Sequence, residues 1–349
     1  MFGVALLGAG LYPKEAYLPA LHAISVSLVA VYSKSLNTAS EAVEEAKKLS
    51  GLVSPSIGVY SNEQGGDGDV DDLLKRDDVK VVIVSLPTLV QPSIVLKALE
   101  AGKHVLMEKP MAKNIAASKA LLDEYEAKYQ PKGLVLAVAE QFRYDAGHEK
   151  ARQIIASGGI GTLATVHARI WNLVNPGNKW YETEWRKKPE YMGGFLLDGG
   201  VHFIAFIRYV AGEEIVETAS FARQTLDHLP PLDTVQAVLK FESGALGTLS
   251  MSFASVKNDY SYVFIGSTGS LTVTGEAGGT RLVVEDATGG VVSDQVIAGT
   301  DTYKELFSSF IRSTESGNED PRGSPKQAIA DVAVVENICT GGGTIESYL

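Results

Sequence analysis

The stretch Val4-Ala5-Leu6-Leu7-Gly8-Ala9-Gly10-Leu11-Tyr12-Pro13 decides the fold that we predict for this chain. Its apolar start indicates a buried strand, and Gly8 permits a tight turn directly after it. Gly10 lets a phosphate group approach the backbone, and a following helix supplies N–H groups and a positive dipole end. Pro13 replaces the third glycine of the usual G-x-G-x-x-G and is compatible with a helix start. The stretch predicts a dinucleotide-binding turn, with a purely structural glycine turn as the alternative.

The rest of the first 140 residues alternates between short apolar runs and helical patterns. The predicted strands are Phe2–Leu7, Ser27–Tyr32, Val79–Leu86, His104–Met107 and Leu134–Ala139. The predicted helices are Thr38–Leu49 with a capping box at Thr38–Glu41, Pro92–Ala101 ending at Gly102, and Asn114–Lys128. Pro19 leaves the length of the first helix open. This alternation predicts an α/β fold with a doubly wound parallel sheet, the Rossmann architecture.

The pattern changes after residue 140. We expect helices at Ala146–Ser157 and Val201–Ala211, a strand at Thr162–Trp171, and closing helices at Tyr303–Thr314 and Ser324–Cys339. Between Glu217 and Ile297 apolar residues recur with a period of two, which predicts a large, mostly antiparallel sheet with one face on helices. The chain is therefore divided into a Rossmann domain, 1–140, and an α/β domain, 141–349. The final helix can pack back across that boundary.

Composition excludes several classes of protein. The 349 residues carry 31 basic and 42 acidic side chains, a net charge of −11, which argues against nucleic acid or an anionic membrane as the partner. The single cysteine, Cys339, excludes an intramolecular disulfide and favours a reducing compartment. No apolar run reaches the about 18 residues of a membrane helix, and the early strand leaves no room for a signal peptide. We expect a cytoplasmic protein without a metal site.

The end of the second strand bears on which dinucleotide binds. NAD sites usually carry Asp or Glu there to bind the ribose hydroxyls. This chain has Tyr32-Ser33-Lys34-Ser35, without a carboxylate. Ser33 and Ser35 can donate to a 2′-phosphate that Lys34 neutralises, so the loop favours NADP over NAD. A solvated serine–lysine loop is the alternative.

Two further patterns carry candidate chemistry. Lys109 follows the buried strand that ends in Glu108, and such strand ends face the ligand crevice of a doubly wound sheet. Asp198 and His202 are four residues apart, so on a helix they share a face and the carboxylate can orient the imidazole. The alternative makes Asp198 a helix cap and His202 a packing residue. Four surrounding glycines, within Gly193–Gly200, favour close approach of the backbone to a ligand.

These residues resemble the glucose–fructose oxidoreductase/inositol dehydrogenase/MocA family, and specifically a fungal-type NADP-binding subgroup. The resemblance rests on the Gly8-Ala9-Gly10 turn, Ala101–His104 leading into Glu108-Lys109-Pro110, Gly158–Gly161, and Trp185-Arg186 before Gly193–His202. It implies a Rossmann domain followed by a domain whose open sheet face often forms dimers, so we expect a homodimer or higher homo-oligomer. It also implies that Lys109 holds the reacting oxygen, that His202 is the acid/base, and that Asp198 supports them.

The resemblance and the patterns together give a candidate site. Residues expected at the cofactor are Gly8, Gly10, Leu11, Tyr12, Ser33, Lys34, Ser35, Leu86, Pro87, Gln91, Glu108 and Lys109, with Gln91 standing where many members carry histidine. Residues expected at the substrate are Arg143, Tyr144, Trp171, Trp185, Asp198 and His202, with Trp180, Tyr181, Tyr191 and Arg186 as further candidates. Aromatic walls suit sugar faces or other ring systems, whereas core packing and ion pairs are the alternatives for these aromatic and arginine residues.

The function predicted is an NADP-dependent oxidoreductase that moves a hydride between the nicotinamide and an alcohol or carbonyl carbon of a small molecule, such as a sugar or polyol. Two alternatives stay open. One is an NADP-sensing regulatory protein without catalysis, which has no need of the proton-transferring residues. The other is a reductase of imines, enones or dihydrodiols on the same fold.

Overall fold

The computed structural model describes residues 3–63 and 68–349, so Phe2 at the start of the predicted first strand lies outside the described residues. The chain forms two compact units. The first unit comprises Met1–Ala112, Ala116–Gln141 and Asp301–Pro325, and the second comprises Lys113–Ile115, Phe142–Thr300 and Lys326–Leu349. The chain therefore returns to the first unit at Asp301–Pro325. Its last helix, which follows this segment, belongs to the second unit.

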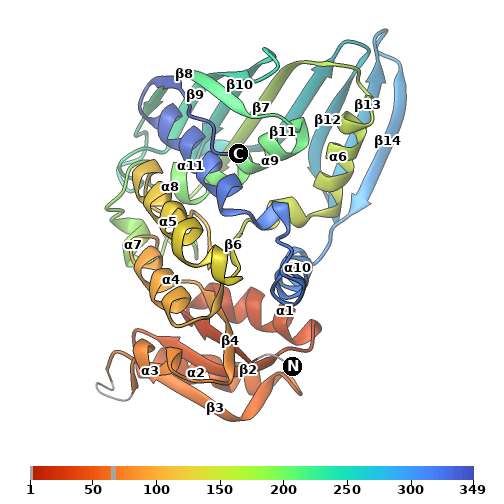
Figure 1. Cartoon of the computed structure of the whole chain (residues 1–349). Helices are drawn as coiled ribbons and strands as arrows, with labels where there is room; N and C mark the ends of the chain where they lie inside the picture. The colour runs from red at the N-terminus through yellow and green to blue at the C-terminus, as the bar shows by residue number, and fades with distance from the viewer. Residues whose placement is uncertain (1–2, 64–67) are drawn as a thin grey trace. The chain divides into compact units, whose positions relative to one another are not determined.

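The first unit contains a six-stranded parallel sheet in the order β3-β2-β1-β4-β5-β6, which confirms the predicted Rossmann architecture (Figure 1). Its strands are β1 (Gly3–Leu7), β2 (Ser27–Ser33), β3 (Val53–Ser61), β4 (Val79–Val84), β5 (His104–Glu108) and β6 (Leu136–Ala139). The central strands are almost wholly buried, as expected for parallel strands covered on both faces.

The sequence pattern does not predict strand β3, because this segment carries weak strand signals. It contains Pro55 and Gly58, and several of its residues are partly or fully exposed. These features are tolerated because β3 is the edge strand of the sheet, where one side of the backbone needs no partner strand.

The first unit also contains helical segments, most of which connect these strands. They are η1 (Pro13–Tyr17), α1 (Leu18–Ala23), α2 (Leu36–Lys47), α3 (Val70–Leu74), α4 (Gln91–Glu100), α5 (Ile115–Lys128), η3 (Gln130–Lys132), α10 (Thr302–Ser316) and η5 (Pro321–Gly323). The first is a π-helical turn in which the N–H of Leu18 bonds to the carbonyl of Pro13. Pro19 explains the wider turn, because it has no N–H to donate to the preceding turn and its ring crowds that turn.

The predicted capping box at Thr38–Glu41 is wrong. The N-cap of helix α2 is Ser35, three residues before the predicted cap Thr38. The Ser35 Oγ accepts the N–H of Thr38 at 3.2 Å, so the serine of the predicted phosphate loop satisfies a helix donor. By contrast, the predicted end of α4 is confirmed, since Gly102 has φ +72°.

The second unit contains a nine-stranded sheet in the order β14-β13-β12-β11-β7-β10-β9-β8-β15 (Figure 1). Among the strand pairs that the structure describes in this sheet, β7 and β10 are parallel and the others are antiparallel, so the predicted mostly antiparallel sheet is confirmed. Its strands are β7 (Leu163–Leu173), β8 (Ile215–Arg223), β9 (Thr234–Phe241), β10 (Leu246–Ser252), β11 (Ala254–Gly266), β12 (Gly269–Glu276), β13 (Gly279–Asp286), β14 (Val291–Ala298) and β15 (Gly342–Thr344).

Helices cover one face of this sheet, which we call the inner face, and the face without helices is the outer face (Figure 1). The helices of the second unit are α6 (Ala146–Ala156), α7 (Glu184–Lys187), α8 (Phe195–Asp198), α9 (Gly200–Ala211) and α11 (Pro325–Cys339), preceded by the turn η4 (Gln141–Tyr144). The core lies between α9 and the inner face, where the rings of Phe206 and Tyr262 have centroids 4.2 Å apart. The alternation along β9 matches this, because Val235, Ala237 and Leu239 are buried.

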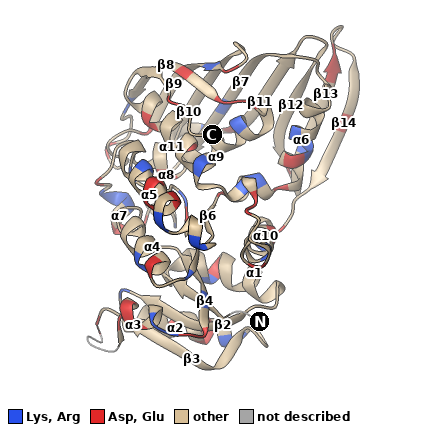
Figure 2. Cartoon of the chain, in the orientation of Figure 1, with Lys and Arg blue, Asp and Glu red and all other residues tan. Residues whose placement is uncertain are grey.

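Charged residues are interspersed over the helices. Figure 2 shows basic and acidic positions interspersed along the ribbon of α5. On this helix Lys128 pairs with Glu124 and Lys119 with Asp123. Within the part of the chain that the structure describes, no helix is long and apolar enough to span a bilayer.

Candidate functional site

The two glycines of the turn after β1 have different surroundings. Gly8 is tightly packed, whereas the space beside Gly10 is empty. Gly8 has φ +104°, and a Cβ there would lie 2.0 Å from the carbonyl oxygen of Ser85. Gly10 is exposed, and a Cβ there would meet no atom within 4 Å. The helical turn begins directly afterwards, at Leu11. The open backbone at Gly10 and the helix start fit a pyrophosphate group.

The loop after β2 lies against the start of α2. Ser33 is buried, Lys34 is exposed, and Ser35 is partly buried as the helix cap. The N–H of Leu36, the first residue of α2, donates to the Glu63 carboxylate at 3.0 Å. A carboxylate therefore does lie at this loop, but it comes from the turn after β3 and not from the end of β2.

Lys109 follows β5, and buried hydrogen bonds hold the backbone before it. The Gln91 side-chain amide donates to the carbonyl of Glu108 at 3.2 Å, and its oxygen accepts the N–H of Glu108 at 3.1 Å. Gln91 is 1% exposed, so its amide serves the Glu108 backbone, although we expected it at the cofactor. The Glu108 carboxylate in turn accepts hydrogen bonds from the Tyr17 hydroxyl and, at 3.1 Å, from the N–H of Lys109. The Lys109–Pro110 peptide bond is cis.

Aromatic rings surround this carboxylate on the side of the glycine turn. The hydroxyls of Tyr12 and Tyr303 are hydrogen bonded, and the Tyr17 and Phe307 ring centroids are 5.0 Å apart. Burial, and then the charge of Glu108, raise the pKa of Tyr303 well above its usual value. The cluster fixes the first helical turn after Gly10 against α10. Tyr303 and Phe307 had no signal in the sequence, because they lie nearly 200 residues beyond Glu108.

Leu86 and Pro87 follow β4 and lie beside the same turn. A Cβ on Gly8 would lie 3.3 Å from the Leu86 side chain. The carbonyl of Pro87 accepts the N–H groups of Val90 and Gln91 at 2.8 and 3.2 Å, which starts α4. The structure thus brings the predicted cofactor residues after β1, β4 and β5 to one edge of the first unit's sheet.

In the second unit, Asp198 is held by Arg186. The Arg186 Nε donates to the carboxylate at 2.7 Å, and Asp198 is 6% exposed. Asp198 ends α8, and Gly199 links it to α9 in helical conformation, so Asp198 and His202 do lie one helical turn apart. The alternative of Asp198 as a helix cap is wrong, since Gly199 occupies that position. The partly buried His202 ring stacks on Phe142, with centroids 4.8 Å apart.

The glycines around this pair serve packing, which corrects the expectation that they face a ligand. A Cβ on Gly199 would lie 2.9 Å from the Phe253 ring, and one on Gly200 would lie 2.9 Å from Met251. Both glycines therefore let α9 approach the inner sheet face closely. Gly194 has φ +48°, and a Cβ there would lie 2.4 Å from the carbonyl oxygen of Pro230.

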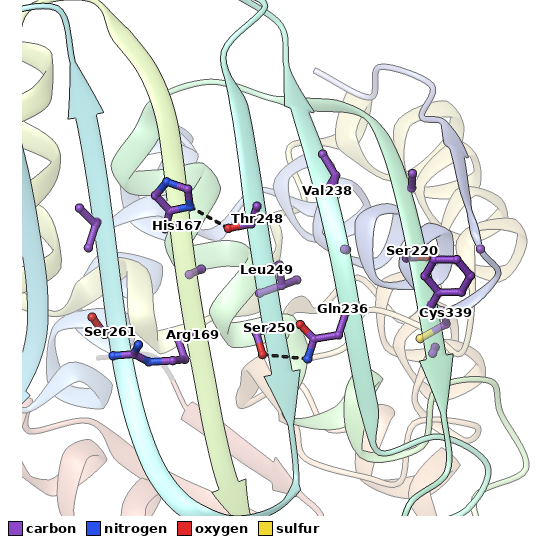
Figure 3. A pocket seen from close by; sticks show the side chains of 17 residues that line it. His167, Arg169, Ser220, Gln236, Val238, Thr248, Leu249, Ser250, Ser261 and Cys339 are labelled. Carbon is purple, nitrogen blue, oxygen red and sulfur yellow. Dashed lines mark hydrogen bonds between the residues drawn. The ribbon is translucent and has the colours of Figure 1, made fainter.

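Arg143 and Trp171 lie elsewhere than the sequence suggested. Arg143 is 2% exposed and pairs at 2.5 Å with Asp331, which also binds the buried Arg208, so its charge is used inside the second unit. The Trp171 indole donates to Ser250 at 2.8 Å on the outer face, whereas His202 is on a helix of the inner face. Figure 3 shows Ser250 on that outer face with His167 and Arg169.

The remaining substrate candidates lie in the second unit. Tyr144 is buried in η4. Trp185 lies next to Arg186, whose guanidinium is 4.1 Å from its ring centroid, and it packs on the core. Tyr191 is buried, and burial followed by the charge of Asp198 raises its pKa. Trp185 and Tyr191 thus lie around the Arg186–Asp198 pair, and Trp171 does not.

Comparisons with known proteins identify relatives along the whole chain. Residues 2–132 match the model described as "Oxidoreductase family, NAD-binding Rossmann fold", and residues 148–272 match the "GFO/IDH/MocA C-terminal domain". The chain is 33% identical over 343 residues to the dehydrogenase FPY6 of Fusarium mangiferae, covering 97% of this chain and 95% of that protein. It is 25% identical over 258 residues to a myo-inositol 2-dehydrogenase of Thermotoga maritima, covering 71% and 73%. The crystal structure of a Thermotoga maritima oxidoreductase superposes with a TM-score of 0.86 at 27% identity, covering 100% and 99%.

Proposed function

Because this chain belongs to the GFO/IDH/MocA family of NAD(P)-dependent oxidoreductases, we propose that it is an NADP-dependent dehydrogenase or reductase of a small molecule. The proposed reaction moves a hydride between the nicotinamide and an alcohol or carbonyl carbon. One observation carries this proposal. Asp198, held by Arg186, lies one helical turn before a partly exposed His202, in a chain whose first unit has an open Gly10 turn.

The residues of the first unit that would hold the dinucleotide lie after β1, β2 and β4. The backbone at Gly10 would receive the pyrophosphate, because a side chain there would fill the space it needs. Leu86 and Pro87 would line the same pocket, and Ser33 and Lys34 would bind the adenosine end. When bound, the cofactor supplies or accepts the hydride.

Lys109 is proposed to bind the reacting oxygen. Its ammonium would stabilise negative charge on that oxygen as a carbonyl is reduced or an alcohol loses its proton. The two Gln91 bonds and the Glu108 carboxylate fix the backbone from which the lysine extends. Such preorganisation supports catalysis because less reorganisation is needed during the reaction.

His202 is proposed to be the acid/base that exchanges the proton with the substrate. A neutral imidazole can accept a proton from an alcohol, and an imidazolium can give one to a developing alkoxide. Stacking on Phe142 limits the rotation of the ring. Asp198 lies one helical turn before His202, and the Arg186 Nε donates to its carboxylate at 2.7 Å, so the pair is proposed to orient the imidazole.

The preference for NADP is proposed from the Ser33-Lys34-Ser35 loop. It carries a lysine and two serines and no carboxylate of its own. The proposed substrate class is a sugar, a polyol or a related carbonyl compound. The myo-inositol 2-dehydrogenase among the relatives supports a polyhydroxylated substrate.

A substrate panel followed at the NADPH absorbance band, and repeated with NADH, tests this function. We expect turnover of a polyol or sugar carbonyl with NADPH favoured. The H202N and K109M variants should lose about a hundredfold or more of turnover while NADPH binding persists. The matched control is H22N, because the exposed His22 ring bonds to the carbonyl of Ser50 at 3.1 Å on the surface of the first unit.

Unchanged turnover in H202N and K109M would contradict the proposed roles. NADPH binding without turnover on any carbonyl, imine or enone would favour a sensor in place of an enzyme. Preference for NADH would overturn the interpretation of the loop.

We also propose that the outer sheet face pairs with a second copy of the chain. This face holds a hollow of about 1060 Å³ lined by His167, Arg169, Gln236 and Val238 among others (Figure 3). Phe221 and Val238 on it are 88% and 50% exposed. Apolar side chains exposed together on one face are typical of an interface. Light scattering should give the mass of a dimer for the unmodified chain and of a monomer for F221E. The control is V291E at the sheet edge, which should stay a dimer. An unchanged mass for F221E would contradict the proposed interface.

A further inference from the structure

The carboxylate of Glu63, in the turn after β3, lies at the beginning of α2. Glu63 Oε2 accepts the N–H of Leu36 at 3.0 Å. Leu36 directly follows the Ser33-Lys34-Ser35 loop. The N-terminus of a helix attracts anions, because its first N–H groups lack partners and the helix dipole is positive there. Glu63 therefore occupies an anion position beside the loop that is proposed to receive a 2′-phosphate.

A second backbone donor at this helix start, the N–H of Thr38, is also engaged. The Ser35 Oγ accepts the N–H of Thr38 at 3.2 Å and is 2.7 Å from the Thr38 hydroxyl. Ser35 thus uses an acceptor lone pair for capping, and its hydroxyl hydrogen is the group that a phosphate and the Thr38 hydroxyl would share. A phosphate at the start of α2 would have to compete with Glu63 for the N–H of Leu36.

The neighbouring strand end places a further polar group at this edge. Ser61 pairs with Ser33 across β3 and β2, is fully buried, and its hydroxyl has no hydrogen-bond partner among the described residues. A buried hydroxyl without a partner costs free energy unless a bound group satisfies it. Next to it, the Tyr32 hydroxyl donates to Asn62 at 2.6 Å, which ties the turn that carries Glu63 to the end of β2.

We propose that Glu63 sets how strongly this chain discriminates between the 2′-phosphorylated and the unphosphorylated dinucleotide. Its carboxylate opposes a 2′-phosphate by like charge and by holding the N–H of Leu36. It has no such conflict with a free ribose hydroxyl, which can donate to it. The inference rests on the proposed function, in that the adenosine end of the cofactor binds at the Ser33–Ser35 loop.

The test is calorimetric binding of 2′,5′-ADP and of 5′-AMP to the full chain and to E63Q. A glutamine keeps an oxygen that can accept the N–H of Leu36 and removes only the charge. We expect E63Q to bind 2′,5′-ADP about tenfold more tightly, because one like-charge contact near the surface is relieved. The affinity for 5′-AMP should stay within about twofold, since that ligand carries no 2′-phosphate.

The matched control is E44Q. Glu44 lies on the exposed side of α2 and pairs with Lys47 at 2.7 Å. The E44Q substitution therefore removes the same charge as E63Q, but at a different place. If E63Q and E44Q change the ratio of the two affinities equally, the effect is general electrostatics and the proposal is wrong. An unchanged ratio in E63Q overturns it as well. The ratio of the two affinities in the unmodified chain tests the proposed NADP preference. The change of that ratio in E63Q tests the role of Glu63. The two tests are independent, because a chain that prefers 5′-AMP can still show a changed ratio in E63Q. Failure of both probes to bind either form would overturn both proposals.

Discussion

The Arg186 guanidinium donates from Nε to the carboxylate of Asp198 at 2.7 Å, and so joins the Trp185-Arg186 motif to the start of the helix that carries His202. Asp198 is 6% exposed, and the side chain of Arg186 is 19% exposed. The pair compensates a carboxylate that would be costly to bury alone. Through this contact we expect Arg186 to position Asp198 one helical turn before the proposed acid/base, His202.

Removing Arg186 should therefore cost both stability and turnover. R186A removes the Arg186 cation from the buried Asp198 carboxylate, and we expect the free energy of unfolding to fall by about 2 kcal/mol. Urea unfolding measures the loss. The control is R281A, which breaks an Arg–Asp pair of similar length with Asp294 on the exposed part of the sheet, where little change is expected. Equal effects of the two substitutions would mean that burial of Asp198 is unimportant.

Gln91 should control the geometry of Lys109 without touching substrate. Q91L removes both amide partners of the buried Glu108 backbone, and each group left unsatisfied costs about 1–3 kcal/mol. We expect lower stability and a lower kcat, with a smaller change in KM. Q153L is the matched control, because the amide of the exposed Gln153 donates to the Glu149 carboxylate at 2.9 Å on the surface of α6. Unchanged kcat in a folded Q91L would contradict the positioning role.

The two glycines of the first turn should fail in different ways when each is replaced by alanine. G8A forces a Cβ to 2.0 Å from the Ser85 carbonyl at φ +104°, so we expect loss of stability. G10A meets no protein atom within 4 Å, so the fold should persist while NADPH binds about tenfold or more weakly. Thermal unfolding and NADPH titration separate the outcomes. G275A, at another open glycine, should change neither, and tight NADPH binding by G10A would argue against the proposed pyrophosphate position.

Stability should fall in mild acid through His104. Burial lowers the pKa of this histidine from its usual 6.5, and its Nδ1 accepts the N–H of Val135 at 3.1 Å. The unfolded chain therefore binds the proton more readily, so the stability that the neutral ring contributes above pH 6.5 is lost as the pH falls below it. Urea midpoints at pH 8 and 5.5 measure the loss. H104Q should reduce this pH dependence and the exposed H22Q should not; identical pH profiles for H104Q and the unmodified chain would exclude His104 as the cause.

Both sheets and the turn at Gly8-Ala9-Gly10 could be predicted from the amino-acid pattern alone. Hydrophobic period and glycine position are local properties, because a continuous apolar run selects a buried parallel strand and alternation selects a sheet covered on one face. The sequence also placed Asp198 and His202 one helical turn apart, since that spacing follows from helix geometry alone.

Only the tertiary structure decided which partners these residues have. The glycines before His202 are small because Phe253 and Met251 press against α9, and Arg143 is committed to Asp331 nearly 190 residues away. Trp171 turned out to lie on the outer face, because neighbouring residues of a strand alternate between faces and the sequence does not say which face carries helices. The Glu63 carboxylate at the start of α2 likewise comes from another strand's turn. Such long-range pairings depend on how strands are ordered in the sheet, which no local pattern encodes.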